Sequence, residues 1–94
     1  MKDVVTLKVA GTTNVKSLAG SISYILKGDD STPPKHVELL AIGASSCSQA
    51  LKSVAISSGH MATWGGTVKM RVGFKVVQIE GQERTVMRML VECE

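Results

Sequence analysis

The chain has 94 residues, 44% of them hydrophobic, and carries a formal net charge of +3. This length predicts one domain, residues 1–94, around a single core, and the hydrophobic content excludes an intrinsically disordered chain. No apolar run approaches the ~20 residues that a membrane-spanning helix needs. The first residues also lack the apolar stretch of a signal peptide, so we expect a cytoplasmic protein with no membrane partner.

The first third of the chain predicts a strand and then a helix. Residues 4–10 alternate apolar and polar side chains, the period of a strand with one buried face. Thr13 or Asn14 is expected to cap the helix by accepting a bond from its first N–H groups, and Gly28 to end it. The helix carries one apolar stripe, made by Val15, Leu18, Ala19, Ile22, Ile25 and Leu26.

The middle of the chain predicts a strand–helix unit on which both ends of the chain pack. Residues 37–42 are apolar except for Glu38, which is typical of a short strand covered on both faces. Ser45 or Ser46 is expected to cap the helix that follows, and Gly59 to end it. The predicted apolar stripe of this helix is Cys47, Ala50, Leu51, Val54 and Ala55.

The last third predicts a long hairpin, which completes a β-α-β-α-β-β order. Residues 68–76 and 84–91 alternate with the period of two, and Gly81 between them supplies the positive φ of a tight turn. The apolar face of the first hairpin strand is long for a domain of this size. An uncovered apolar surface usually marks an interface, so we expect a homodimer or higher homo-oligomer with the second helix and the hairpin at the contact.

Basic residues are concentrated in the hairpin. Residues 67–91 hold five basic and two acidic side chains. The five are Lys69, Arg71, Lys75, Arg84 and Arg88. The first three lie on one face of one predicted strand, where such a row is able to follow a phosphate backbone. The alternative is that they only block edge-to-edge aggregation, and spacing alone does not choose between the two.

The sequence shows no catalytic or metal-ligating constellation. It has no nucleophile elbow, zinc-protease motif or P-loop, and neither Cys47 nor Cys93 belongs to a CxxC pair. We therefore expect no enzymatic activity, no metal and no cofactor. Residues 43–46 bring backbone N–H groups and serine hydroxyls to a helix start, which favours an anion. A small-molecule or phosphate-binding enzyme with its site at this turn is a third alternative.

Two segments carry a resemblance to a known family. Residues 42–62 (IGASSCSQALKSVAISSGHMA) and 80–92 (EGQERTVMRMLVE) resemble the stage V sporulation protein S family, with its patterns IGAGAxNQAxKAxAIARG and DGEERTAxxLxVE. The matching positions are Ile42-Gly43-Ala44, Gln49-Ala50, Lys52, Val54-Ala55-Ile56, Gly59, Gly81 and Glu83-Arg84-Thr85. Ser48 departs from the family's asparagine, and Ser57-Ser58 from its Ala-Arg pair.

That family is similar to the Alba proteins, small nucleic-acid binders that dimerise. The resemblance implies an Alba-like two-layer α/β domain: a four-stranded mixed sheet, two helices on one face and a long C-terminal hairpin. In Alba proteins, basic residues of the first β–α connection and of the hairpin contact nucleic acid. The corresponding positions here are Lys16 in the connection and Lys69, Arg71, Lys75, Arg84 and Arg88 on the hairpin.

The predicted function is therefore binding of DNA or RNA, mainly through phosphates, in a non-enzymatic, sporulation-type regulatory role. The competing hypothesis is a homo-oligomerising protein-interaction module that binds no nucleic acid.

Overall fold

Six elements follow one another along residues 3–94, the part of the chain that the computed structural model describes. They are β1 (Val4–Val9), α1 (Val15–Lys27), β2 (His36–Ala41), α2 (Gly43–Ala62), β3 (Val68–Ile79) and β4 (Gln82–Cys93). The strands form one sheet in the order β1-β2-β4-β3, with β1 and β2 parallel and the other neighbours antiparallel. The predicted element order and mixed four-stranded sheet are confirmed.

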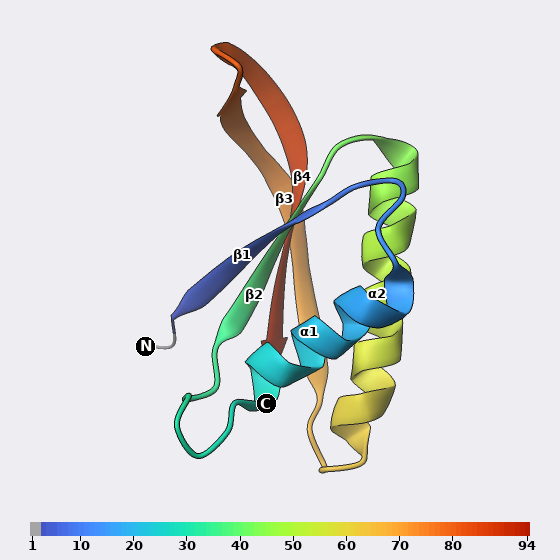
Figure 1. Cartoon of the computed structure of the whole chain (residues 1–94), viewed down its shortest axis with the longest axis vertical. Helices are drawn as coiled ribbons and strands as arrows, with labels where there is room; N and C mark the ends of the chain where they lie inside the picture. The colour runs from blue at the N-terminus through green and yellow to red at the C-terminus, as the bar shows by residue number, and fades with distance from the viewer. Residues whose placement is uncertain (1–2) are drawn as a thin grey trace.

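The molecule has two layers, with both helices on the same face of the sheet (Figure 1). Strands β3 and β4 are twice as long as β1 and β2, at 12 residues against 6. The hairpin therefore projects past the rest of the domain, with its turn at the far end (Figure 1). None of the helices in residues 3–94 is long and apolar enough to cross a membrane.

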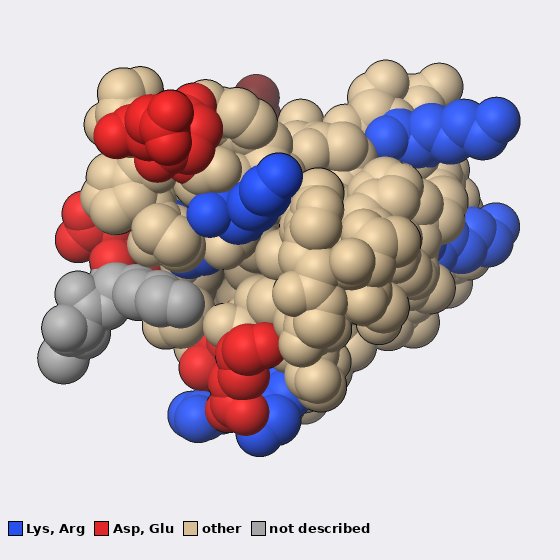
Figure 2. All heavy atoms as spheres, turned by 90° about the horizontal axis from the view of Figure 1, so that it is seen from below, with Lys and Arg blue, Asp and Glu red and all other residues tan. Residues whose placement is uncertain are grey.

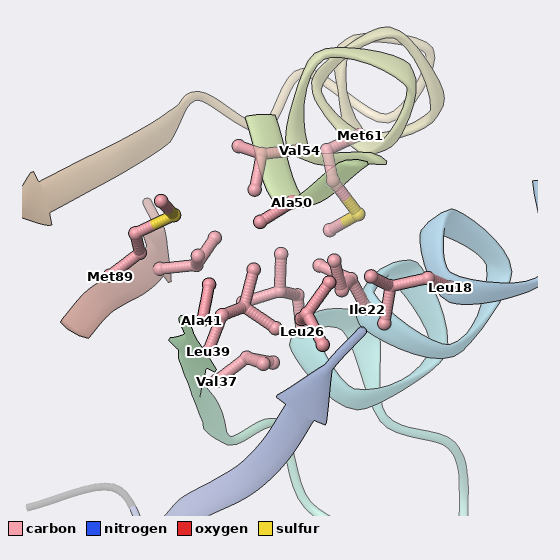
Figure 3. Packing of buried hydrophobic residues seen from close by; sticks show 12 residues of the cluster. Leu18, Ile22, Leu26, Val37, Leu39, Ala41, Ala50, Val54, Met61 and Met89 are labelled. Atoms are coloured by element: carbon pink, nitrogen blue, oxygen red, sulfur yellow. The ribbon is translucent and has the colours of Figure 1, made fainter. Parts of the chain in front are cut away.

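The core lies between the helices and the sheet, and Figure 3 shows side chains from both layers meeting there. Helix α1 contributes Leu18, Ile22 and Leu26, while the central strand β2 contributes Val37 and Leu39. Helix α2 and strand β4 also contribute side chains to this cluster. Since alternate residues of a strand face opposite ways, the even-numbered residues of β2 face the side of the sheet without helices.

Helix α1 begins and ends where its polar residues predict. The Oδ1 of Asn14 accepts a hydrogen bond of 2.9 Å from the backbone N–H of Ser17, which satisfies a group that the helix leaves unpaired. Gly28 ends the helix with a φ of 69°, and its N–H donates to the carbonyl of Tyr24. The predicted apolar stripe faces the core, and Ser23 is buried with it.

The predicted ends of the second helix are wrong. Helix α2 begins at Gly43, directly after β2, and its N-cap residue Ile42 makes no capping hydrogen bond. Gly43 has a φ of 84°, so it turns the chain from strand into helix without a loop. Ser45 and Ser46 therefore lie in the first turn of the helix. Gly59 lies inside the helix, which continues to Ala62.

The predicted core face of α2 is also wrong in part. Leu51 is 48% exposed, although the apolar pattern places it in the core. The buried residues of α2 are Ser46, Ala50, Ser53, Val54, Ser57 and Met61. Their spacing follows one helical face, but half of that face is serine. A pattern of apolar residues alone therefore predicts a buried face of α2 that is displaced by about one residue from the observed buried face.

Serines let α2 pack closely on α1, because their hydroxyls find partners there. The Oγ of Ser53 donates to the carbonyl of Gln49 at 2.8 Å and lies 3.2 Å from that of Val15. The hydroxyls of Ser23 and Ser57 share a hydrogen bond of 2.9 Å. Buried hydroxyls that are hydrogen-bonded avoid the cost of desolvation, so this polar contact substitutes for apolar packing.

The hairpin turn confirms its prediction. Ile79 pairs with Gln82, which leaves a two-residue loop of Glu80 and Gly81. Both loop residues have positive φ, 52° and 78°, as the type I′ turn requires to match the twist of the strands.

Of the apolar face of β3, Met70 packs against the core, while the part beyond it is left uncovered by the helices, as predicted for Val72 and Phe74. Phe74 is 77% exposed, and its same-face neighbours Val72 and Val76 are more than half exposed.

Candidate nucleic-acid interface

The hairpin register brings all its basic residues to one face. Gly73 pairs with Arg88, Lys75 with Val86, and Val77 with Arg84, and directly paired residues point to the same side of a sheet. The neighbouring residues of β4, Met89 and Val91, belong to the core under the helices. We call the opposite, helix-free side of the sheet the open face. It carries Lys69, Arg71, Lys75, Arg84 and Arg88, together with Lys8 of β1.

Two of these basic residues form ion pairs with acids near the end of the chain. Lys69 Nζ lies 2.9 Å from Glu94 Oε1, and Arg71 Nε lies 3.5 Å from Glu92 Oε1. The side chains of Lys69 and Arg71 are 60% and 79% exposed. Exposed pairs of this kind contribute only about 0–1 kcal/mol, so a stronger anion is able to replace the carboxylate.

Glu38, at the centre of the open face, forms ion pairs with two more basic residues, Lys75 and Arg88. It is 5% exposed and accepts hydrogen bonds from Thr6 Oγ1 at 2.9 Å, Lys75 Nζ at 3.3 Å and the Nε of Arg88. The hydrogen bond from Arg88 is the main reason that the pKa of Glu38 lies below its ordinary value. Lys75 and Arg88 are therefore tied to a buried acid, unlike Lys69 and Arg71.

Glu38 makes stability depend on pH in a defined direction. Its pKa in the folded state is below the ordinary value of 4.5, so its contribution is present above that value and is lost as pH falls through the folded-state pKa. We expect Glu38→Gln to lower the free energy of unfolding by about 1–3 kcal/mol at neutral pH. The difference from wild type should shrink below pH 4.5 in urea unfolding curves measured from pH 7 to pH 3.

Glu83→Gln is the control for this experiment. Glu83 is exposed and forms no ion pair within residues 3–94, so its removal should leave both stability and pH dependence near wild type. A Glu38→Gln variant that tracks wild type at every pH would show that the buried ion pairs contribute nothing to folding.

Arg84, Lys8 and Lys16 have no acidic partner within 4.0 Å in residues 3–94. Arg84 lies in the projecting part of the hairpin, and Lys8 lies on β1, the edge strand opposite β3. Lys8 was not among the predicted site residues, although its alternation in strand one placed it opposite the core. These cations are free to meet a phosphate without breaking an ion pair.

Lys16 belongs to a different side of the molecule from the hairpin residues. It lies in the first turn of α1, on the helix layer. Gln49 Nε2 donates to the carbonyl of Thr13 at 2.9 Å, and Ser53 Oγ lies 3.2 Å from that of Val15. These contacts hold the start of α1 against the part of α2 that also carries the exposed Lys52, which the sequence reasoning did not select.

Figure 2 shows the end of the molecule opposite the hairpin turn, and this end is not uniformly basic. Acidic and basic side chains lie against one another at its lower margin, and acidic side chains gather at the upper left of this view (Figure 2). On the helix side, two basic side chains project with no acidic neighbour in this view (Figure 2). The described residues 3–94 contain no cluster of His, Cys, Asp or Glu side chains suited to holding a metal ion.

Comparison with known proteins bears out the resemblance. The chain superposes on Alba from Thermoplasma volcanium with a TM-score of 0.56, over 98% of this chain and 99% of that one. At 12% sequence identity, this likeness shows the Alba fold and no more. The sequence model of stage V sporulation protein S matches residues 5–94. With nearly the whole chain covered by that match, the protein belongs to the stage V sporulation protein S family.

Proposed function

We propose that this protein binds nucleic acid through phosphate contacts on the open face of the hairpin, in a non-enzymatic, sporulation-type regulatory role. The register of β3 and β4 carries the proposal, because it aligns five basic side chains on a face without helices. Membership of the stage V sporulation protein S family supports the regulatory role, and the Alba fold supports the mode of binding.

The ion pairs rank the basic residues of the proposed interface. Arg84 and Lys8 have no acidic partner in the described residues and meet phosphates directly, while Lys69 and Arg71 exchange a weak exposed carboxylate contact for a phosphate. Lys75 and Arg88 stay with Glu38 and mainly add positive potential. Lys16 forms a secondary contact from the helix side.

The proposal is tested by the salt dependence of binding. Affinity should fall with salt at a slope of about −0.9 per phosphate contacted on duplex DNA, or about −0.7 on a single strand. The triple variant Lys69→Gln, Arg71→Gln and Arg84→Gln should flatten that slope by roughly two to three units. The loss should be similar for all sequences, since phosphates carry no base information. The affinities of wild type and variant are measured by fluorescence anisotropy at about 50 and 200 mM salt.

A matched control removes the same charge elsewhere. Lys27→Gln, Lys35→Gln and Lys52→Gln also lower the net charge by three, but all three residues lie outside the open face. This control should keep most of the wild-type slope. Identical binding curves for wild type and the hairpin variant would contradict the hypothesis that the hairpin binds nucleic acid.

The second candidate is a homo-oligomerising interaction module without nucleic-acid binding. The apolar strip of Val72, Phe74 and Val76 favours it, because three exposed apolar side chains in a row on a projecting strand are costly in water. The two candidates differ in one result. If the protein is only an interaction module, wild type and the hairpin variant should bind nucleic acid equally poorly, and the oligomer should stay intact in both.

A further inference from the structure

A cavity of 460 Å³ lies where the carboxyl ends of β1 and β2 meet the start of α2. This volume is within the range of small-molecule sites, about 300–1,000 Å³. The ends of parallel strands beside a helix start are also a common location for ligands. The cavity is distinct from the ion-paired part of the open face, since it is lined by none of Lys69, Arg71, Lys75 and Arg88.

The walls of the cavity are mainly apolar. Part of them comes from the section of the hairpin that extends beyond the end of β2. Ala41 and Met87 form the last pair between β2 and β4, so the hairpin continues without a neighbouring strand. Its far end then faces the junction between β2 and α2, and the two together enclose the space. The apolar walls are Leu40, Ile42, Val77, Ile79 and Val86.

One largely buried serine in the wall of this cavity has a hydroxyl without a hydrogen-bond partner in residues 3–94. Ser46 is only 6% exposed, lines the cavity, and makes no hydrogen bond through its side chain within residues 3–94. The other buried serines all have such a bond. Because Ser46 lines the cavity and its hydroxyl makes no side-chain hydrogen bond within residues 3–94, this hydroxyl is available to a ligand.

Positive charge accompanies this hydroxyl. Lys8 is the one charged side chain among the residues that line the cavity, and no carboxylate pairs with it in the described chain. The start of α2 also has no capping side chain, which leaves the positive end of the helix dipole without an acceptor. The polar part of the cavity therefore favours an anion.

We propose that the cavity binds a small amphipathic anion. Its carboxylate or phosphate meets Ser46 and Lys8, and its apolar body lies against Leu40, Ile42 and Val86. This second site shares Lys8 with the proposed nucleic-acid interface but uses none of Lys69, Arg71 or Arg84.

The experiment is a titration of the isotope-labelled full chain with hexyl phosphate, followed by amide chemical shifts. We expect saturable shifts at the lining residues Gly11, Ile42, Ser46 and Gln78. Hexanol and inorganic phosphate each lack one half of the ligand and should bind at least tenfold more weakly. Equal binding by hexanol would overturn the anionic part of the proposal, and equal binding by inorganic phosphate the apolar part. An absence of shifts at the lining residues would overturn both.

Matched variants locate the contacts. Ser46→Ala and Lys8→Gln should each weaken hexyl phosphate about fivefold or more, whereas Ser48→Ala and Lys52→Gln, which change residues outside the cavity, should not. Ile42→Trp adds bulk at a half-exposed wall and should block binding while the protein stays folded. Unchanged affinity in the first two variants would contradict the assignment. The hairpin triple variant should bind hexyl phosphate like wild type, which separates this site from the proposed function.

Discussion

Replacing Leu39 by Ala is expected to lower the free energy of unfolding by about 2–5 kcal/mol. Leu39 is fully buried in the central strand β2, between Leu7 of β1 and Met89 of β4, and faces the helices. Its truncation leaves a cavity that the close-packed neighbours fill only in part. A domain of this size has roughly 5–15 kcal/mol of stability in total, so the shift of a urea unfolding curve should be unmistakable.

Leu51→Ala is the matched control, because it removes the same atoms from a half-exposed side chain. It should cost about 1 kcal/mol or less, since much of the side chain already contacts water. Both variants are compared by circular dichroism at one low protein concentration, so that assembly does not contribute. Equal losses would mean that α2 turns the face of Leu51, and not that of Ala50 and Val54, towards the core.

Replacing Phe74 by Lys is expected to convert a dimer into a monomer, if the apolar strip is the contact between copies. Phe74 is the most exposed of the large hydrophobic residues in the described chain, at 77%, and lies at the middle of the strip. A charge placed there cannot be buried against a second copy without a large desolvation cost. Light scattering at tens of micromolar should therefore show a wild-type dimer and a variant monomer, with the fold of the protomer unchanged by circular dichroism.

Gln82→Lys adds the same charge to the hairpin on its other face, next to the turn. This control should remain a dimer. A wild-type chain that is monomeric at these concentrations would remove the interaction-module hypothesis. A Phe74→Lys variant that stays dimeric would place the contact on another surface.

Local patterns in the sequence determined the order of the elements. The alternation of strands and the stripe of α1 are properties of neighbouring residues, as is the cap at Asn14. The turn at Glu80 and Gly81 follows from backbone conformations that few residues adopt. Because these preferences act over a few residues, they needed no knowledge of the rest of the chain, and the Alba-like arrangement followed from them together with the family resemblance.

The tertiary structure alone decided which face of α2 is buried. Serines have no apolar signal, and their burial depends on hydroxyl partners far along the chain, such as Ser23 for Ser57. Leu51 was therefore assigned to the core and lies half exposed instead.

The same reason applies to the candidate interface. The basic alternation of the hairpin was visible in the sequence, but its acidic partners were not, since Glu38 is 37 residues from Lys75 and 50 from Arg88. Sheet order brings these groups together, and it also brings Ser46 and Lys8 to one cavity with the end of the hairpin. Charge and hydroxyl content can be counted along a chain, whereas their pairing depends on long-range contacts that only the packed sheet and helices create.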